Sequence, residues 1–432
     1  MSFLKKSVIT FATSIGMMII GMASGIIVAR TLGPELKGQS ALLASITEFL
    51  FMGGSLGLGS SFSFYIAKKQ YPSRYILSCA LFCSLILGVL ATGVFYLTMP
   101  LHNNVWEGIP KRLIFSAALL AVLSIYANYL VRIVVGYGRI AEMNLGSIAN
   151  SLANFSSIIF FVLFMGLALD GMMVSFWLSI LVQIMVLLYV LRADLSLTTF
   201  WSTGLMRNSL SYGVKSHSLF LINFLNYRID MLLLRHFTDA ATVGYYSLAV
   251  GMAEMMWMLP NSAVAPLFSG VAASAAKDRS LITLRTVRWS LILIIFLALP
   301  SIVFGRYLIQ LLYGTDYLPS YMPFLWLLPG ICLFPIYKLL SVDLAARGRP
   351  GLGTISSAVA LVVNIIANII LIPRMGGAGA ALATSLSYIC MSIVTILFFI
   401  NVTENRIRDI FVIDIEEIDY IKRFIFSLFK HR

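Results

Sequence analysis

Long stretches of apolar residues, almost free of charge, follow one another along the whole chain. A soluble domain carries about 25% charged residues, whereas this chain is 11% charged and 59% hydrophobic. The stretches are longer than the roughly 10 residues of a membrane β-strand, and they reach the roughly 20 residues with which an α-helix crosses a bilayer. The sequence therefore predicts an all-α polytopic membrane protein.

Short polar connections divide the chain into about twelve expected transmembrane helices. The expected spans are 8–29, 40–66, 75–99, 113–135, 144–168, 171–191, 209–235, 242–270, 287–305, 321–346, 351–373 and 377–400. The first apolar run is longer than the hydrophobic core of a typical signal peptide, so we expect it to be a retained helix. Residues 401–432 mix acids and bases with Ile and Phe, which predicts an amphipathic cytoplasmic tail.

The distribution of Lys and Arg predicts the orientation of these spans. The net charge is +13, and the basic residues lie mainly in the short loops. With a cytoplasmic N-terminus, fifteen Lys and Arg fall on the cytoplasmic side before the tail, against seven on the other side. Because cytoplasmic loops are enriched in basic residues, we expect both termini to be cytoplasmic, and we expect no nucleic-acid partner.

Two sequence patterns that each occur twice, here called echoes, predict that the chain consists of two related halves. In the first echo an Arg is followed by a Gly and then, ten residues later, by a Glu: Arg30, Gly38 and Glu48, then Arg235, Gly244 and Glu254. In the second, GR at 138–139 and MG at 165–166 return at 348–349 and 375–376. We expect six-helix lobes at 1–200 and 201–400, related by a pseudo-twofold axis along the membrane normal.

The expected seventh span is unusually polar. Lys215, Asn223, Asn226, Arg228 and Asp230 lie inside it, although ionisable groups within a membrane are costly and usually face a cavity or one another. One interpretation is a hydrated cavity that binds an anionic head group, with Arg228 as the main contact because guanidinium pairs bidentately with phosphate. The alternative is a set of internal ion pairs, such as Arg228 with Glu254, which fix helix packing.

Other charged residues within or beside the spans complete the candidate site. Glu48 and Glu254 occupy matching positions in the repeat, and with Asp230 they are candidates for ion coupling, because a buried carboxylate can be loaded and emptied. Each of them could instead be a structural carboxylate. Arg30 and Arg235 lie at the outer ends of their spans, where an arginine is either an interfacial anchor or part of the mouth of an anion path.

Signals of catalysis are missing from the sequence. The four histidines are scattered, and the HExxH, CxxC and Walker A patterns do not occur. The four cysteines lie inside apolar spans without metal-ligand spacing. We therefore expect no enzyme activity, no metal site, no cofactor and no ATP hydrolysis by this chain.

Several segments resemble the polysaccharide flippase branch of the multidrug/oligosaccharidyl-lipid/polysaccharide exporter superfamily. The resemblance covers nearly all of residues 1–400. It is carried by ARTLGPELKG at 29–38, NYRID at 226–230, VGYYSLA at 243–249, and ARGRP at 346–350 followed by Asn364 and GGAGAA at 376–381. It implies two six-helix lobes around a central cavity lined by the first, second, seventh and eighth spans.

The resemblance also implies a function. A flippase of this branch would move an oligosaccharide linked to undecaprenyl pyrophosphate from the cytoplasmic to the periplasmic face of a bacterial inner membrane, for O-antigen or exopolysaccharide synthesis. Alternating access, H⁺ or Na⁺ coupling and polysaccharide polymerase partners would follow. Arg30 and Arg228, then Lys215 and Arg235, would bind the pyrophosphate. The alternatives are a drug or cation antiporter that uses Glu48, Asp230 and Glu254, and a membrane polymerase or acyltransferase.

Overall fold

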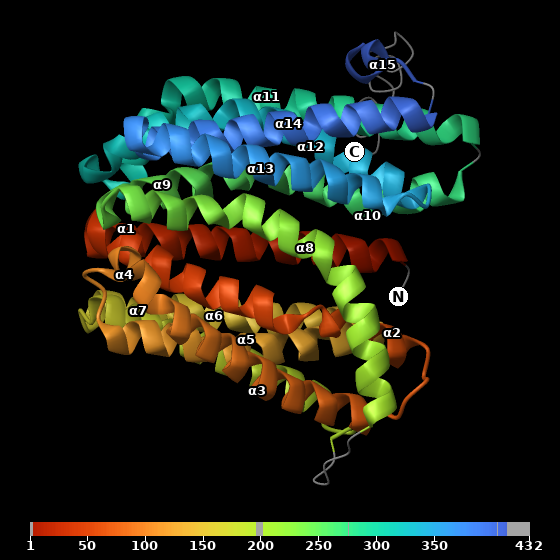
Figure 1. Ribbon diagram of the computed structural model, residues 1–432, viewed down its shortest axis with the longest axis horizontal. Helices are drawn as coiled ribbons and strands as arrows, with labels where there is room; N and C mark the ends of the chain where they lie inside the picture. Colours follow the sequence, from red (N-terminus) through yellow and green to blue (C-terminus); the bar gives the residue numbers. More distant parts are fainter. Residues whose placement is uncertain (1–2, 196–201, 275, 404, 413–432) are drawn as a thin grey trace, which may run out of the picture.

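The computed structural model describes residues 3–195, 202–274, 276–403 and 405–412, and in these ranges the regular structure is entirely helical. Most of the helices are long and run roughly along one common axis (Figure 1). Their apolar sequences explain this arrangement, because a chain in lipid must satisfy its backbone hydrogen bonds internally. The prediction of an all-α polytopic membrane protein is confirmed.

The helices follow the expected spans with some differences at their ends. In chain order they are α1(Phe3–Ser55), α2(Leu58–Ala67), α3(Ser73–Thr98), α4(Asn103–Trp106), α5(Lys111–Gly136), α6(Ile140–Ser157), α7(Ala168–Val190), α8(Thr203–Phe237), α9(Ala240–Glu254), α10(Met258–Ala273), α11(Ala276–Tyr313), α12(Tyr321–Ala346), α13(Pro350–Met375), α14(Gly377–Thr403) and α15(Ile407–Phe411). Gly33 has φ 74° and ψ 174°, and with Pro34 it interrupts α1, so this helix contains the first expected span and the larger part of the second. The remainder of the second expected span lies in α2.

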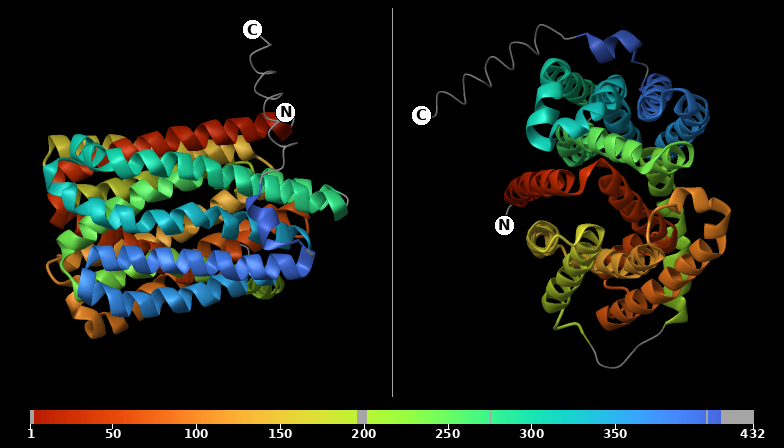
Figure 2. Two further views of the ribbon diagram at one scale, coloured as in Figure 1. Left: turned by 90° about the horizontal axis from the view of Figure 1, so that it is seen from above. Right: turned by 90° about the vertical axis from the view of Figure 1, so that its left-hand side faces the viewer.

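Two groups of helices make up the molecule. The N-terminal group is α1–α7 and the C-terminal group is α8–α15, and the view along the helices shows them on opposite sides (Figure 2, right). The beginning of α1 and the short α15 lie at one end, which we call the termini end (Figure 1). The opposite end, where the chain turns back at Gly33, is the Gly33 end.

Nine helices in the described ranges are long and apolar enough to cross a membrane, so the chain is a multi-pass membrane protein. This number counts the two segments of α1 once. It leaves out the polar α8 and the eighth expected span, which is divided into α9 and α10 by a short 3₁₀ turn at Met255–Trp257. The number of twelve spans therefore stays a prediction.

Helix α8 connects the two groups, which the sequence did not predict. It begins at Thr203, six residues before the expected span, and bends across the N-terminal group before it runs along the C-terminal helices (Figure 1). In its first half, Tyr212 stacks on Phe64 with ring centres 5.0 Å apart, and the Nε2 atom of His217 lies 2.7 Å from the carbonyl oxygen of Met52. The division near residue 200 stays a proposal.

The two groups approach most closely at the Gly33 end, where α1 packs against α9. A methyl group on Gly38 would overlap the backbone of Ala240 and Gly244, and one on Gly244 would overlap Pro34 and Gly38. The same offset of 206 residues separates Gly38 from Gly244 and Pro34 from Ala240. This reciprocal contact is the kind that a twofold relation between two halves produces.

The segment after α14 docks at the termini end. Helix α14 continues to Thr403, beyond the expected end at residue 400. A nitrogen of the buried Arg288 on α11 donates hydrogen bonds to the carbonyl oxygens of Asp409 (2.6 Å) and Val412 (2.7 Å). The rest of the predicted amphipathic tail, residues 413–432, lies outside the described residues.

Candidate transport site

Arg228 lies between the two groups and forms an ion pair with a carboxylate from each of them. Its Nε atom is 3.1 Å from Glu48 on α1, and its NH1 nitrogen is 3.1 Å from Glu254 at the end of α9. The side chains of Arg228 and Glu254 are 26% and 25% exposed, and that of Glu48 is 46% exposed. The two glutamates that the repeat predicted as equivalent therefore meet on one arginine.

This arrangement combines both interpretations of the polar span. The Arg228–Glu254 pair of the packing interpretation is present, and Glu48 extends it across the interface between the groups. With both carboxylates ionised, the three side chains carry a net charge of −1. Arg228 is thus engaged by acids in this conformation, and an anionic ligand would have to compete with them for the guanidinium.

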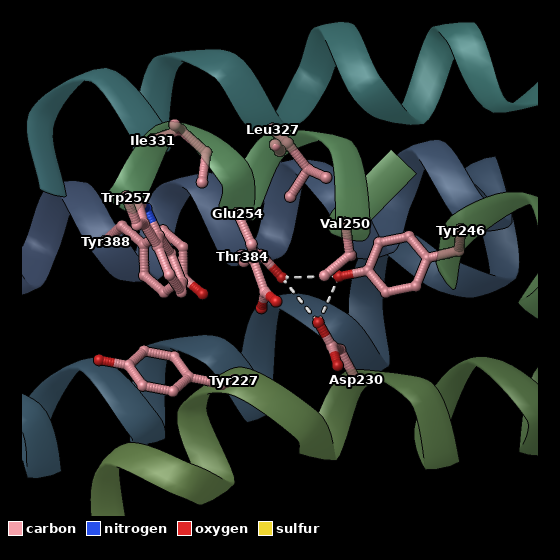
Figure 3. Close-up of a pocket in the computed structure, with 11 residues that line it drawn as sticks. Tyr227, Asp230, Tyr246, Val250, Glu254, Trp257, Leu327, Ile331, Thr384 and Tyr388 are labelled. Atoms are coloured by element: carbon pink, nitrogen blue, oxygen red, sulfur yellow. Dashed lines mark hydrogen bonds between the residues drawn. The ribbon is translucent and has the colours of Figure 1, made fainter. Parts of the chain in front are cut away.

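Asp230 lies two residues further along α8 but faces the interior of the C-terminal group. It is 1% exposed. Its Oδ2 atom accepts hydrogen bonds from Tyr246 on α9 and from Thr384 on α14, the latter at 3.1 Å. Its Oδ1 atom accepts from the backbone NH of Met231 at 2.8 Å. Figure 3 shows the Asp230, Tyr246 and Thr384 oxygens converging on one point.

A small cavity adjoins this triad. It measures about 10 Å³ and is lined by Asp230, Tyr246, Thr384 and Glu254 together with aromatic and aliphatic side chains (Figure 3). A volume of roughly 10–15 Å³ on this scale holds one water molecule. The three oxygen atoms suit a proton or a small hard cation, since such ions prefer carboxylate and hydroxyl ligands. Among the described residues, no group of three or more His, Cys, Asp and Glu side chains forms a metal-binding cluster.

The two asparagines of α8 pack into the C-terminal group. Asn226 is fully buried, and it donates to the carbonyl oxygen of Ser357 at 2.8 Å and accepts from Ser387 at 3.1 Å. Asn223 accepts from Tyr337 at 2.9 Å. These side chains fix α8 against α13, α14 and α12. Lys215 lies within α8, but its side chain is outside the described part of the chain.

Arg30 and Arg235 bind backbone carbonyls of the opposite group at the Gly33 end. Arg30 donates from Nε to the carbonyl oxygen of Leu312 at 2.8 Å, and also to that of Leu311. Arg235 donates from NH2 to the carbonyl oxygen of Glu107 at 2.9 Å. The same offset of 205 residues separates Arg30 from Arg235 and Glu107 from Leu312. Two equivalent arginines thus connect the two groups by hydrogen bonds at this end, and we call these contacts the arginine clasps.

The sequence did not single out the partners of Asp230. Tyr246 belongs to the VGYYSLA segment and Thr384 follows the GGAGAA segment, so both lie in or beside stretches that carried the resemblance. Hydropathy gave no sign that these hydroxyls would meet, because Thr384 is 154 residues from Asp230 in the chain. Only the packing of α8, α9 and α14 brings them together.

The sequence of the chain matches a known protein family. The family described as "Polysaccharide biosynthesis protein" matches residues 3–272. A curated relative, the probable low-salt glycan biosynthesis flippase Agl15 of Haloferax volcanii, is 23% identical over 219 residues, which are 47% of this chain and 46% of the relative. The match thus spans about half the length of that relative.

Solved transporter structures share the fold. An inward-facing multidrug resistance MATE family transporter of the MOP superfamily superposes with a TM-score of 0.75 and 17% identity over 90% of this chain and 94% of its own. The lipid II flippase MurJ, in an inward closed conformation, superposes with a TM-score of 0.74 and 17% identity over 93% and 89%. The chain has the fold of these transporters, and by its sequence it belongs to the polysaccharide biosynthesis protein family.

Proposed function

We propose that the chain is a flippase that moves a polyprenyl-diphosphate-linked oligosaccharide across the membrane by alternating access. The family match supports a role in polysaccharide synthesis, and the relative named as a flippase supports a lipid-linked glycan as the substrate. The proposed substrate is an undecaprenyl-linked repeat unit of an O-antigen or exopolysaccharide. The proposed site is the bacterial inner membrane, with polysaccharide polymerases as partners.

The observation that carries the proposal is the closure of the Gly33 end by reciprocal contacts. Equivalent residues of the two groups meet there, in the Gly38–Gly244 packing and in the arginine clasps. Contacts of this kind can separate as a unit when two bodies rock against each other. Arg228 with its two glutamates lies where such rocking would break the Glu48 pair and leave the Glu254 pair, since Glu254 belongs to the same group as Arg228.

Opening of the Gly33 end would therefore release cationic groups. The guanidinium of Arg228 would lose one carboxylate, and Arg30 and Arg235 would lose their carbonyl partners. Freed guanidinium groups bind phosphate oxygens well. We propose that the Gly33 end faces outward and that both termini are cytoplasmic, in agreement with the positive-inside bias and with the inward conformations of the two structural neighbours.

Ion coupling is assigned in this proposal to Asp230, with Glu48 and Glu254 as the linked carboxylates. Asp230 and Arg228 are two residues apart on α8, and Arg228 also contacts Glu254. A proton or Na⁺ bound at the Asp230, Tyr246 and Thr384 oxygens would change the position of this part of α8. Ion binding in the small cavity would then favour either the closed or the open Gly33 end, because the Arg228–Glu48 ion pair forms only when this end is closed.

A drug or cation antiporter is the second candidate, because the Arg228 site carries two carboxylates for one guanidinium. Such a protein would protect cells against cationic compounds, and its loss would leave surface polysaccharide unchanged. The flippase proposal expects the reverse. Cells that lack the protein should accumulate lipid-linked repeat units on the cytoplasmic leaflet. Unchanged surface polysaccharide without such accumulation would overturn the flippase proposal.

A further inference from the structure

A second polar cavity lies at the junction of α1, α2, α5 and α8, near the termini end. Its volume is about 140 Å³, and its polar lining comes from Ser55, Ser60, Asn128, Arg132 and His217, with Phe51, Met52, Phe220 and two glycines between them. About 10–15 Å³ on this scale holds one water molecule. The cavity therefore has room for several waters or for a small polyatomic anion.

The cavity is cationic, unlike the Arg228 site. Arg132 is its one charged lining residue among the described residues, and no Asp or Glu lines it. Arg132 lies one turn before the end of α5 and is exposed. Arg132 differs in this respect from Arg228, which lies between two carboxylates. An anion at Arg132 would not have to displace an acid.

A glycine on α2 leaves room for the side chain of Arg132. A methyl group on Gly59 would lie 2.9 Å from the Cγ atom of Arg132 and 3.1 Å from the Oδ1 atom of Asn128. Glycine at this position therefore lets both side chains lie across α2 toward the cavity. On the other wall, the Nε2 atom of His217 contacts the carbonyl oxygen of Met52, which holds the ring against α1.

The cavity is connected to the Arg228 site by α8. His217 and Arg228 are eleven residues apart on this helix, about 16 Å along its axis at 1.5 Å per residue. Phe220 and Phe224 lie between them, and Phe224 packs edge-on against Phe49 of α1 with ring centres 4.9 Å apart. An anionic group at Arg132 would thus lie beside the part of α8 nearest the termini end, and the same helix continues to Arg228.

We propose that the cavity formed by Arg132, Asn128 and His217 is a phosphate-binding site that receives the diphosphate of the lipid-linked substrate before it reaches Arg228. The assignment of the substrate rests on the proposed flippase function, but the anion chemistry does not. Arg132 supplies the charge and paired donors, Asn128 supplies an amide donor, and Ser55 and Ser60 supply hydroxyls. Guanidinium and amide donors of this kind suit phosphate oxygens.

The test is a binding measurement on the full chain in phosphatidylcholine nanodiscs with radiolabelled undecaprenyl diphosphate. Arg132→Gln should weaken binding about tenfold or more, the usual effect of losing a charged hydrogen-bond partner. Arg192→Gln is the matched control, because Arg192 is exposed near the same end and lies over the Tyr189 ring, 4.1 Å from its centre. Equal affinity of wild type and Arg132→Gln, or an equal loss in both variants, would overturn the site.

A second variant guards against misfolding. Gly59→Ala keeps the charge of Arg132 but displaces its side chain, so it should weaken binding several-fold. A cooperative thermal unfolding transition of this variant would show that the protein is still folded. Wild-type affinity in Gly59→Ala would contradict the proposed geometry.

Competition identifies the source of the phosphate: inorganic pyrophosphate should displace the labelled lipid, and phosphatidylglycerol at equal concentration should not. The opposite result would make the cavity an ordinary membrane-lipid site and overturn the proposal.

The failure of this site and the failure of the flippase function have different signatures. Binding that depends on Arg132, without any transport by the reconstituted wild-type protein, would support the phosphate site and remove the flippase function. Transport by the wild type at a rate that Arg132→Gln leaves unchanged, together with unchanged binding, would remove the phosphate site and leave the flippase function standing.

Discussion

Substitution of Gly38 by alanine should prevent full closure of the Gly33 end. A methyl group there would lie 2.8 Å from the carbonyl carbon of Ala240 and 2.9 Å from the nitrogen of Gly244, and closer still to the Ala240 oxygen. Non-bonded carbon atoms pack at about 3.5–4.0 Å, so α1 and α9 would have to separate by at least about 1 Å. Overpacking of this kind costs about 1–3 kcal/mol, which corresponds to a roughly 5–150-fold shift between conformations.

The assay is a distance measurement between spin labels on the two groups. Cysteines at the exposed Leu101 and Met375 would carry the labels, after replacement of the four native cysteines. The Gly38→Ala variant should move the distribution toward longer distances. Gly251→Ala on α9 is the control, because a methyl group there meets nothing within 4 Å. Identical distributions in wild type and Gly38→Ala would refute the proposed closure.

Three further predictions concern the charged groups. Arg30→Ala and Arg235→Ala should each lengthen the same distance between the labels. Arg374→Ala should not, because Arg374 lies at the same end but makes no hydrogen bond to the opposite group among the described residues. Asp230→Asn should leave folding intact but abolish the dependence of transport on H⁺ or Na⁺, as measured by flux across ion gradients. Backbone and side-chain hydrogen bonds at the start of α9 lower the pKa of Asp239, so its stabilising effect is present above about pH 4. Asp239→Ala should lower the free energy of unfolding by about 1 kcal/mol at pH 7, and this difference should fade as the pH drops through the lowered pKa; a constant difference down to pH 3 in thermal unfolding would contradict it.

Much of the fold could be predicted because a bilayer allows few solutions. The apolar runs had to be helices, and the repeat in the sequence pairs Gly38 with Gly244 and Glu48 with Glu254. The structure then brings each of these pairs together. Offsets in the sequence were informative because equivalent residues of two related halves meet at the axis between them.

The course of α8 and the partners of its charges could not be predicted in the same way. Hydropathy does not indicate which group a helix packs against, so it could not place Tyr212 on Phe64. The sequence placed Asp230 inside the polar seventh span, but it did not indicate that the hydroxyls of Tyr246 and Thr384 would face it. In the sequence, Arg132 is only one of the fifteen basic residues expected on the cytoplasmic side, because the cavity beside it is formed by residues of four helices.

Transport by the purified protein is the decisive measurement of flippase activity. The protein would be reconstituted in liposomes with an undecaprenyl-diphosphate-linked oligosaccharide, and the fraction of sugar accessible on each leaflet would be followed in time. We expect that the wild type equilibrates the sugar between leaflets and that Arg228→Gln is slower by about tenfold or more, the usual effect of losing a charged hydrogen-bond partner. Equal rates in protein-free liposomes and in liposomes with the wild type would contradict the flippase function, and full activity of Arg228→Gln would contradict the role of this arginine in transport.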